Sequence, residues 1–230
     1  MRKLIFFVCL FFISCKKEVK IFPKQNTITK KIFGDTSSKS KTILKNTVND
    51  TTFVNIKSIS NNFVLDLKYA TTNNFLHKKV YNCPDCYLRY QTAQALNRAN
   101  IDFIKQGFKI KLFDCYRPLD VQKKMWQILP GTNYVANPAK GSKHNKGAAV
   151  DLTLVDALGN ELNMGTGFDF FGPEAHHTFT NHSKEVLRNR KILKETLEKY
   201  NFKSIYNEWW HYEYIPQRQA KVSNFKWKCP

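Results

Sequence analysis

Two short segments of the chain, residues 142–151 and 208–211, hold the side chains with the most demanding chemistry. Together they supply two histidines and two carboxylates, the set of ligands and general base that is typical of a catalytic zinc site. Such a site uses three protein ligands around one ion and leaves a fourth position for water. The fold must therefore bring together two segments that lie far apart in the sequence.

The spacing within each segment limits the local backbone. His144 and Asp151 are seven residues apart, so on one flat strand their side chains would point to opposite faces. Gly147 lies between them and allows a turn, which predicts His144 in a loop and Asp151 on the strand that follows. Glu208 and His211 are three residues apart, so we expect Glu208 in the bend entering a strand and His211 at the start of that strand.

Each of these residues also has an ordinary structural interpretation. A lone histidine is more often a surface or core residue than a ligand, and Asp151 could be a buried acid that caps a neighbouring loop. Glu208 could be a surface carboxylate, and the aromatic pair Trp209-Trp210 is typical of a core. Taken singly, the ordinary interpretations are favoured, but the four residues together favour a metal site.

Hydrophobic periodicity predicts an α+β domain over residues 51–230. Apolar residues recur at helical spacing over residues 87–106 and 183–200, and a shorter helix is expected to begin at Pro118. Strand patterns cover residues 63–69, 108–113, 148–155 and 210–215. Because helices and strands do not alternate strictly, we expect a small, mostly antiparallel sheet with packed helices.

The amino terminus has the features of an export signal. A short basic start precedes an apolar run at residues 4–13, which is too short for a membrane-spanning helix of roughly 20 residues. The run ends in Ile13-Ser14-Cys15, which resembles the lipobox of bacterial lipoproteins, where the signal is cut before a lipid-bearing cysteine. We therefore predict a signal peptide at residues 1–14, lipidation at Cys15 and a flexible tether over residues 15–50. An ordinary secretory signal is the alternative.

Four cysteines remain in the expected domain: Cys83, Cys86, Cys115 and Cys229. Outside the cytoplasm, such an even set indicates disulfides. The segment Cys83-Pro-Asp-Cys86 could be a redox pair, half of a zinc site or a local structural disulfide. A second CxxC and a thioredoxin-like βαβ pattern are both missing from the sequence, so we favour the structural interpretation. The sequence does not assign the partners.

The net charge of the chain excludes few classes of function. Its 37 Lys and Arg against 18 Asp and Glu give a net charge of +19, a balance often found in proteins that bind nucleic acid or anionic surfaces. Residues 51–230 are also basic, but they contain no arginine-rich helix and no basic–aromatic repeat. We therefore expect no nucleic-acid partner.

The pattern SxHxxGxAxD followed by ExxH resembles the zinc D-Ala-D-Ala peptidases, the LAS group that also includes the hedgehog-like fold. Further segments are similar to one branch, the VanX-type D-alanyl-D-alanine dipeptidases: residues 66–75, 114–118 and 164–170, with His176-His177. The resemblance runs from about residue 55 to residue 216. It implies a hedgehog/DD-peptidase-like α+β fold.

The resemblance also implies a role for each site residue. One zinc ion per chain would be held by His144, Asp151 and His211. Glu208 would be the general base that activates water and later protonates the leaving amine, and Arg117 would polarise the scissile carbonyl. Ser142 and Asp169 would hold the ends of the substrate, with Asp169 on the free ammonium group. A loop-capping serine and a turn aspartate are equally good interpretations of these two residues.

We therefore expect a zinc metallopeptidase that hydrolyses the D-Ala-D-Ala dipeptide and is tethered by lipid to a membrane of the bacterial envelope, on the periplasmic or otherwise extracytoplasmic side. There it would meet dipeptide released by wall turnover. The alternatives are a D,D- or L,D-carboxypeptidase that trims peptidoglycan stems, and a non-catalytic, zinc-stabilised wall-binding module. Residues 164–170 and His176-His177 favour the dipeptidase. Glu208 and Arg117 argue against a binding module, because neither is needed only to hold a metal.

Overall fold

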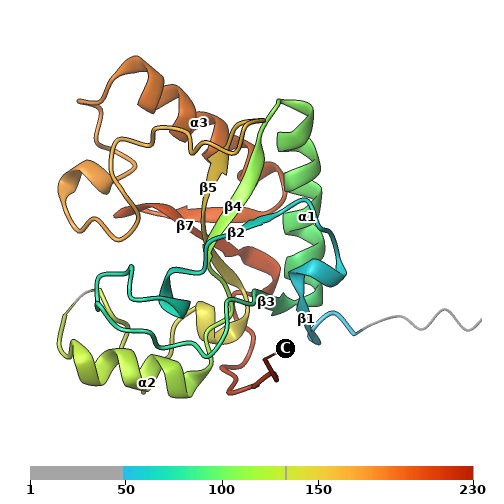
Figure 1. The fold of residues 1–230 in the computed structure, drawn as a ribbon, viewed down its shortest axis with the longest axis vertical. Helices are drawn as coiled ribbons and strands as arrows, with labels where there is room; N and C mark the ends of the chain where they lie inside the picture. The colour runs from blue at the N-terminus through green and yellow to red at the C-terminus, as the bar shows by residue number, and fades with distance from the viewer. Residues whose placement is uncertain (1–48, 133, 230) are drawn as a thin grey trace, which may run out of the picture. The chain divides into compact units, whose positions relative to one another are not determined.

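The computed structural model describes residues 49–132 and 134–229. Within these ranges the chain has an α+β fold, with three α-helices packed beside two sheets (Figure 1). The helices are α1 (Tyr90–Lys105), α2 (Leu119–Ile128) and α3 (Lys184–Lys199), and none of these is long and apolar enough to cross a membrane. The predicted α+β class is confirmed. The predicted signal peptide, Cys15 and nearly all of the predicted tether lie outside the described residues.

The larger sheet has five strands in the order β2-β4-β5-β7-β6. Their bounds are β2 (Val64–Leu65), β4 (Lys109–Asp114), β5 (Ala149–Val155), β6 (Phe202–Ile205) and β7 (Glu208–Tyr214). Strand β2 runs parallel to β4, while the other neighbours in this sheet pair antiparallel. A separate antiparallel pair joins β1 (Phe53–Asn55) to β3 (Tyr87–Arg89). The expected small, mostly antiparallel sheet is confirmed.

The hydrophobic core lies between the larger sheet and helices α1 and α3, which also contact each other. The inward stripe of α1 includes the fully buried residues Leu96, Ala99 and Phe103, at the spacing of one helical face. Every residue of β5 is buried, so this central strand is covered on both faces. Asp151 is the charged residue of β5, and a carboxylate on a buried strand needs charged or hydrogen-bonding partners. The fold thus fixes one site residue near the centre of the sheet.

Two local predictions differ from the structure. Residues 63–69 form a strand only at Val64–Leu65, and the chain then enters a short 3₁₀ helix that buries Tyr69. The helix expected from residue 87 begins at Tyr90, because β3 pairs with β1 instead. Both differences depend on partners that are distant in the sequence, which local periodicity does not reveal.

Two disulfides join Cys83 to Cys229 and Cys86 to Cys115. The structural role predicted for the cysteines is confirmed, but a local bridge between Cys83 and Cys86 is wrong. Each of the two bonds instead to a distant cysteine. The bridges tie the segment before β3 to the end of β4 and to the C-terminal tail.

Candidate metal and substrate site

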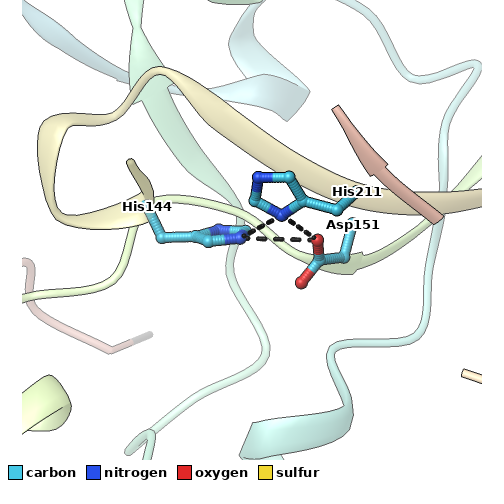
Figure 2. Close-up of side chains that lie close together, drawn as sticks. All are labelled: His144, Asp151 and His211. Atoms are coloured by element: carbon cyan, nitrogen blue, oxygen red, sulfur yellow. Dashed lines mark hydrogen bonds and ion pairs between the residues drawn. The ribbon is translucent and has the colours of Figure 1, made fainter. Parts of the chain in front are cut away.

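Three elements bring His144, Asp151 and His211 together (Figure 2). His144 begins a 3₁₀ turn, His144–Lys146, that leads into β5, and the turn is closed by Gly147 in the left-handed conformation (φ +66°). Asp151 lies on β5 and His211 on β7, and the two are direct cross-strand partners. The expected loop position of His144, the turn at Gly147 and the strand position of Asp151 are confirmed.

The three candidate ligand atoms lie at the spacing that one metal ion requires. His211 Nδ1 is 2.9 Å from Asp151 Oδ1 and 3.2 Å from His144 Nε2, and His144 Nε2 is 3.4 Å from Asp151 Oδ1. Tetrahedral zinc, with ligand bonds of 2.0–2.2 Å, places its ligand atoms about 3.3 Å from one another. All three residues are buried. Both the donor types and their separations fit a zinc-type ion.

Outer contacts orient both histidines toward this point. The Nδ1–H of His144 donates to the backbone carbonyl of Cys115 at 2.7 Å, so the lone pair of Nε2 is available to bind a metal ion. Nε2 of His211 faces Glu213 Oε1 at 3.9 Å, so Nδ1 is directed to the cluster. Burial opposes protonation of His211, but hydrogen bonds with Asp151 and Glu213 raise its pKa to about 10. The surroundings therefore favour a positive charge here, which a bound metal ion also supplies.

The predicted positions of Glu208 in the bend before the strand and of His211 at its start are wrong. Glu208 is the first residue of β7, and His211 lies inside that strand. The pairing with β6 shifts between Ser204, opposite Tyr212, and Ile205, opposite Glu208. This irregularity bulges β7 and brings Glu208 to the side of His211, with Oε2 4.0 Å from Nδ1. Burial raises the pKa of Glu208 more than the nearby His211 lowers it. A raised pKa suits a carboxylate that must both accept and return a proton.

Arg117 follows β4 and is held by buried partners. Its guanidinium forms an ion pair with Asp114 and donates to Gln122 Oε1 at 3.0 Å. Asp114 also accepts a hydrogen bond from the Tyr81 hydroxyl at 2.6 Å. The guanidinium lies over the ring of Tyr69. Arg117 is therefore a fixed, permanently charged donor at the wall of the site.

Asp169 lies in the segment between β5 and α3, in a left-handed backbone conformation (φ +60°) that is uncommon for aspartate. Its Oδ2 accepts a hydrogen bond from the Tyr69 hydroxyl at 2.9 Å. Burial raises the pKa of Asp169 well above its usual range, and the charge of Asp151 adds to this effect. A cation that bound beside Asp169 would relieve this repulsion and stabilise the ionised carboxylate.

Ser142 has a structural role in the turn that carries His144. Its backbone N–H donates to Asn145 Oδ1 at 2.7 Å, and its hydroxyl accepts the N–H of Asn145 at 3.3 Å. The loop-capping interpretation is therefore supported by the structure. Ser142 also lines the same cavity as the candidate ligands, so the two interpretations are compatible.

A single cavity of about 310 Å³ joins the residues that sequence reasoning selected within the described part of the chain. They are Arg117, Ser142, His144, Asp151, Asp169, Glu208 and His211. The volume is at the lower end of the range for small-molecule sites. Tyr134 and Phe171, whose rings stack with centroids 3.7 Å apart, form part of the wall.

Sequence reasoning missed several residues that contact or support the site. Tyr69 and Asp114 lie inside segments that carry the family resemblance, so the sequence indicated that these segments matter. It did not indicate that Tyr69 donates to Asp169 or that Asp114 pairs with Arg117. Glu213, which faces His211, and the pair of Tyr134 and Phe171 had no local signal. Their contacts depend on loops and strands that meet only in the folded chain.

Comparison with known proteins finds a family profile, curated relatives and a solved structure that match this chain. A peptidase M15 family profile, described as D-ala-D-ala dipeptidase, matches residues 49–227. The chain is 34% identical over 171 residues to the D-alanyl-D-alanine dipeptidase of Escherichia coli, covering 74% of this chain and 88% of that protein. It is 32% identical to the D-alanyl-D-alanine dipeptidase of Enterococcus faecalis, covering 66% of this chain and 86% of that protein. A solved vancomycin-resistance D,D-dipeptidase in complex with a D-Ala-D-Ala phosphinate analogue matches with a TM-score of 0.37 and 19% identity, over 71% of this chain and 66% of that chain.

Proposed function

Because the chain belongs to the peptidase M15 family of D-Ala-D-Ala dipeptidases, we propose that it hydrolyses the D-Ala-D-Ala dipeptide to two molecules of D-alanine. One observation carries the proposal on the structural side. A small cavity is lined by the metal-type cluster, by the fixed arginine and by two half-buried carboxylates, those of Glu208 and Asp169. A substrate with a reactive amide close to its own ammonium group matches this arrangement.

We assign one zinc ion per chain to His144, Asp151 and His211, whose donor atoms and separations fit this ion. When bound, zinc supplies a Lewis acid that polarises a carbonyl oxygen and lowers the pKa of water. Two neutral histidines and one carboxylate leave a net positive charge on the ion, which suits that chemistry. The carbonyl of Cys115 keeps His144 in the tautomer that can bind.

Glu208 moves the proton in the proposed reaction. Its carboxylate accepts a proton from the attacking water as the new C–O bond forms at the scissile carbonyl. It then returns this proton to the amide nitrogen as the C–N bond breaks, so that the leaving D-alanine departs as a neutral amine. Burial of Glu208 raises its pKa, which makes the second transfer easier than for an exposed carboxylate.

Arg117 stabilises the negative charge that develops on the carbonyl oxygen. Its ion pair with Asp114 and its hydrogen bond to Gln122 fix the guanidinium before substrate arrives. A donor that needs no reorganisation during the reaction stabilises the transition state more than a mobile one. Arg117 lines the same cavity as the proposed metal ligands.

Asp169 binds the free ammonium group of the substrate in this proposal. Its half-buried carboxylate and the Tyr69 hydroxyl form an acceptor site within the same cavity as Glu208. Ser142 lies at the cavity wall beside His144, where it is available to the carboxylate end. Recognition of both ends restricts the substrate to a dipeptide, which favours the dipeptidase over a carboxypeptidase that trims peptidoglycan stems.

We further propose that the chain is exported and anchored by lipid at Cys15 on the extracytoplasmic side of a membrane in the bacterial envelope. The apolar run and the Ser14-Cys15 sequence support this localisation. The two disulfides of the folded part also support it, because disulfides persist in oxidising compartments. Replacement of Cys15 by Ser in the full chain should release the protein from the membrane fraction. Retention of that variant in the membrane fraction would contradict lipid anchoring.

A panel of three substrates tests the proposed reaction. We expect release of D-alanine from D-Ala-D-Ala, and little or no cleavage of L-Ala-L-Ala or of a pentapeptide that ends in D-Ala-D-Ala. Faster trimming of the pentapeptide than of the dipeptide would support a carboxypeptidase instead. A non-catalytic wall-binding module would bind metal and cleave none of the three.

A further inference from the structure

Arg190 on α3 is a buried arginine whose hydrogen bonds go to backbone carbonyls. Its Nε donates to Met164 O at 2.7 Å, Nη2 to Glu174 O at 2.8 Å and Nη1 to His176 O at 3.1 Å. The side chain is only 6% exposed. Burial lowers its pKa to about 10, so the guanidinium is still charged at neutral pH. Three carbonyls therefore take the place of the acidic partner that a buried arginine usually has.

The three acceptors lie on both sides of Asp169. Met164 precedes Asp169 by five residues, and Glu174 follows it by five. One guanidinium thus fixes both ends of the loop that carries the proposed ammonium ligand. A loop with both ends fixed can hold Asp169 in its uncommon left-handed conformation.

Further contacts tie the same loop to the catalytic strand. The Arg190 guanidinium lies over the ring of Trp209, and the Trp209 indole N–H donates to Thr166 Oγ1 at 2.8 Å. Trp209 follows Glu208 directly on β7. At Gly165, a Cβ atom would lie 2.8 Å from Val186 on α3, so the loop packs closely on the helix. Arg190 and Trp209 therefore link the segment that carries Asp169 to the strand that carries Glu208.

We propose that Arg190 is a positioning residue. It holds the segment from Met164 to His176, the Asp169 loop, against α3 and Trp209. In this way it sets the requirement of the enzyme for a free amino terminus on its substrate. This inference rests on the proposed function, because it uses Asp169 as the ligand of the substrate ammonium group. Arg190 itself does not line the site cavity. Its effect on substrate passes entirely through the loop.

Arg89 provides a matched control within the same chain. It is 8% exposed, and its guanidinium also donates to three backbone carbonyls, those of Lys146, Thr51 and Lys221, at 2.6–2.9 Å. Lys146 belongs to the turn that begins with His144. Loss of Arg89 therefore removes the same number of hydrogen bonds to backbone carbonyls as loss of Arg190. It loosens the turn His144–Lys146, which carries a proposed metal ligand, and leaves the Asp169 loop in place.

The experiment compares Arg190→Met, Arg190→Lys and Arg89→Met in the zinc-loaded full chain. The substrate is D-Ala-D-Ala, and the inhibitor is propionyl-D-alanine, which lacks only the ammonium group. For Arg190→Met we expect KM for D-Ala-D-Ala to rise about tenfold, because one charge-assisted hydrogen bond to the substrate is weakened. The value of kcat and the inhibition constant of propionyl-D-alanine should each change by less than about threefold. Arg190→Lys should recover part of the KM. Arg89→Met should weaken zinc binding in a chelator competition and leave the ratio of KM to inhibition constant unchanged.

Amide hydrogen exchange gives a second readout that does not depend on turnover. In Arg190→Met, exchange should increase over residues 163–177 and stay unchanged over residues 141–147, and Arg89→Met should show the reverse. The proposal is overturned if Arg190→Met leaves exchange over residues 163–177 unchanged, or if it weakens substrate and propionyl-D-alanine equally. Failure of the wild-type protein to cleave D-Ala-D-Ala would instead overturn the proposed function and the selectivity claim with it. The exchange data would still decide whether Arg190 holds the loop.

Discussion

Asp151 on β5 and His211 on β7 face each other directly across the sheet, with Oδ1 of the carboxylate 2.9 Å from Nδ1 of the imidazole. Asp114 on β4 pairs with Asp151 on its other side. Three adjacent strands thus carry a row of site residues at one level of the sheet. Pairing between these strands fixes the relative positions of Asp151, His211 and Asp114, which supports Arg117, while His144 comes from the turn before β5.

Glu208→Gln tests the proposed proton transfer. The amide keeps the size of the side chain but cannot accept and return a proton, so we expect kcat to fall by about 10²–10⁴. KM, zinc content and thermal stability should change little. Steady-state kinetics and metal analysis of the purified variant measure these effects.

Two other glutamates serve as controls for this variant. Glu195→Gln on the exposed face of α3 should leave activity unchanged. Glu213→Gln, on the same strand as Glu208, should mainly weaken zinc binding, by roughly tenfold, because Glu213 faces Nε2 of His211. Equal loss of kcat in Glu208→Gln and Glu213→Gln, with zinc retained in both, would contradict the separate roles.

Arg117→Lys tests the fixed arginine. Lysine keeps the positive charge beside Asp114 but cannot bond to Asp114, Gln122 and substrate together, as the planar guanidinium can. We expect kcat for D-Ala-D-Ala to fall about a hundredfold or more, with zinc content unchanged. A variant with full kcat would show that positive charge alone suffices and that the geometry of Arg117 is unimportant.

His177→Phe tests a pH effect on stability. Burial lowers the pKa of His177 to about 4, and the nearby charges of Lys194 and Arg190 add to this, against a value of 6.5 when unfolded. Between pH 6.5 and 4 the unfolded chain therefore binds more protons at this residue, so stability falls as the pH falls through this window. The charge of Glu198 and the backbone of Glu208 act in the opposite direction, toward a higher pKa.

Phenylalanine keeps the ring that packs edge-on against Tyr212 and removes the titration. Over the same pH range, the free energy of unfolding of His177→Phe should fall by about 1–2 kcal/mol less than that of the wild type. This figure is smaller than the full pKa difference implies, because His177 is partly exposed to solvent. Urea unfolding at several pH values measures this difference. Parallel curves for the two proteins would show that His177 is protonated equally in both states.

The two disulfides should have separable effects. The double variant Cys86→Ala/Cys115→Ala loosens the residue whose carbonyl accepts the His144 Nδ1–H, so we expect zinc binding to weaken by roughly tenfold. The double variant Cys83→Ala/Cys229→Ala opens a much longer loop and should cost about 2–4 kcal/mol of stability with zinc affinity retained. Chelator competition and thermal unfolding distinguish the two outcomes. Equal zinc affinities in the two variants would contradict a specific role for Cys115.

The sequence predicted those parts of the fold whose signals are local. The stripe of α1, the alternation in β4 and the apolar run of β5 each fixed an element close to its observed bounds. Gly147 predicted the turn between His144 and Asp151, and the structure has this glycine in the left-handed conformation.

Other features could not be predicted because they depend on distant contacts. The pairing of Cys86 with Cys115, the start of α1 at Tyr90 and the bulge in β7 each result from segments that meet only in the folded chain. The same applies to Asp114, whose importance follows from its ion pair with Arg117 and its place beside Asp151. Composition and periodicity carry no signal for such relationships.

Zinc-dependent turnover of D-Ala-D-Ala by the purified protein tests the central claim most directly. D-Alanine release should be lost after treatment with a chelator and restored by one equivalent of zinc per chain, and Asp151→Asn should neither bind that equivalent tightly nor recover activity. Full activity that persists in metal-free protein, or in Asp151→Asn without zinc, would contradict the account.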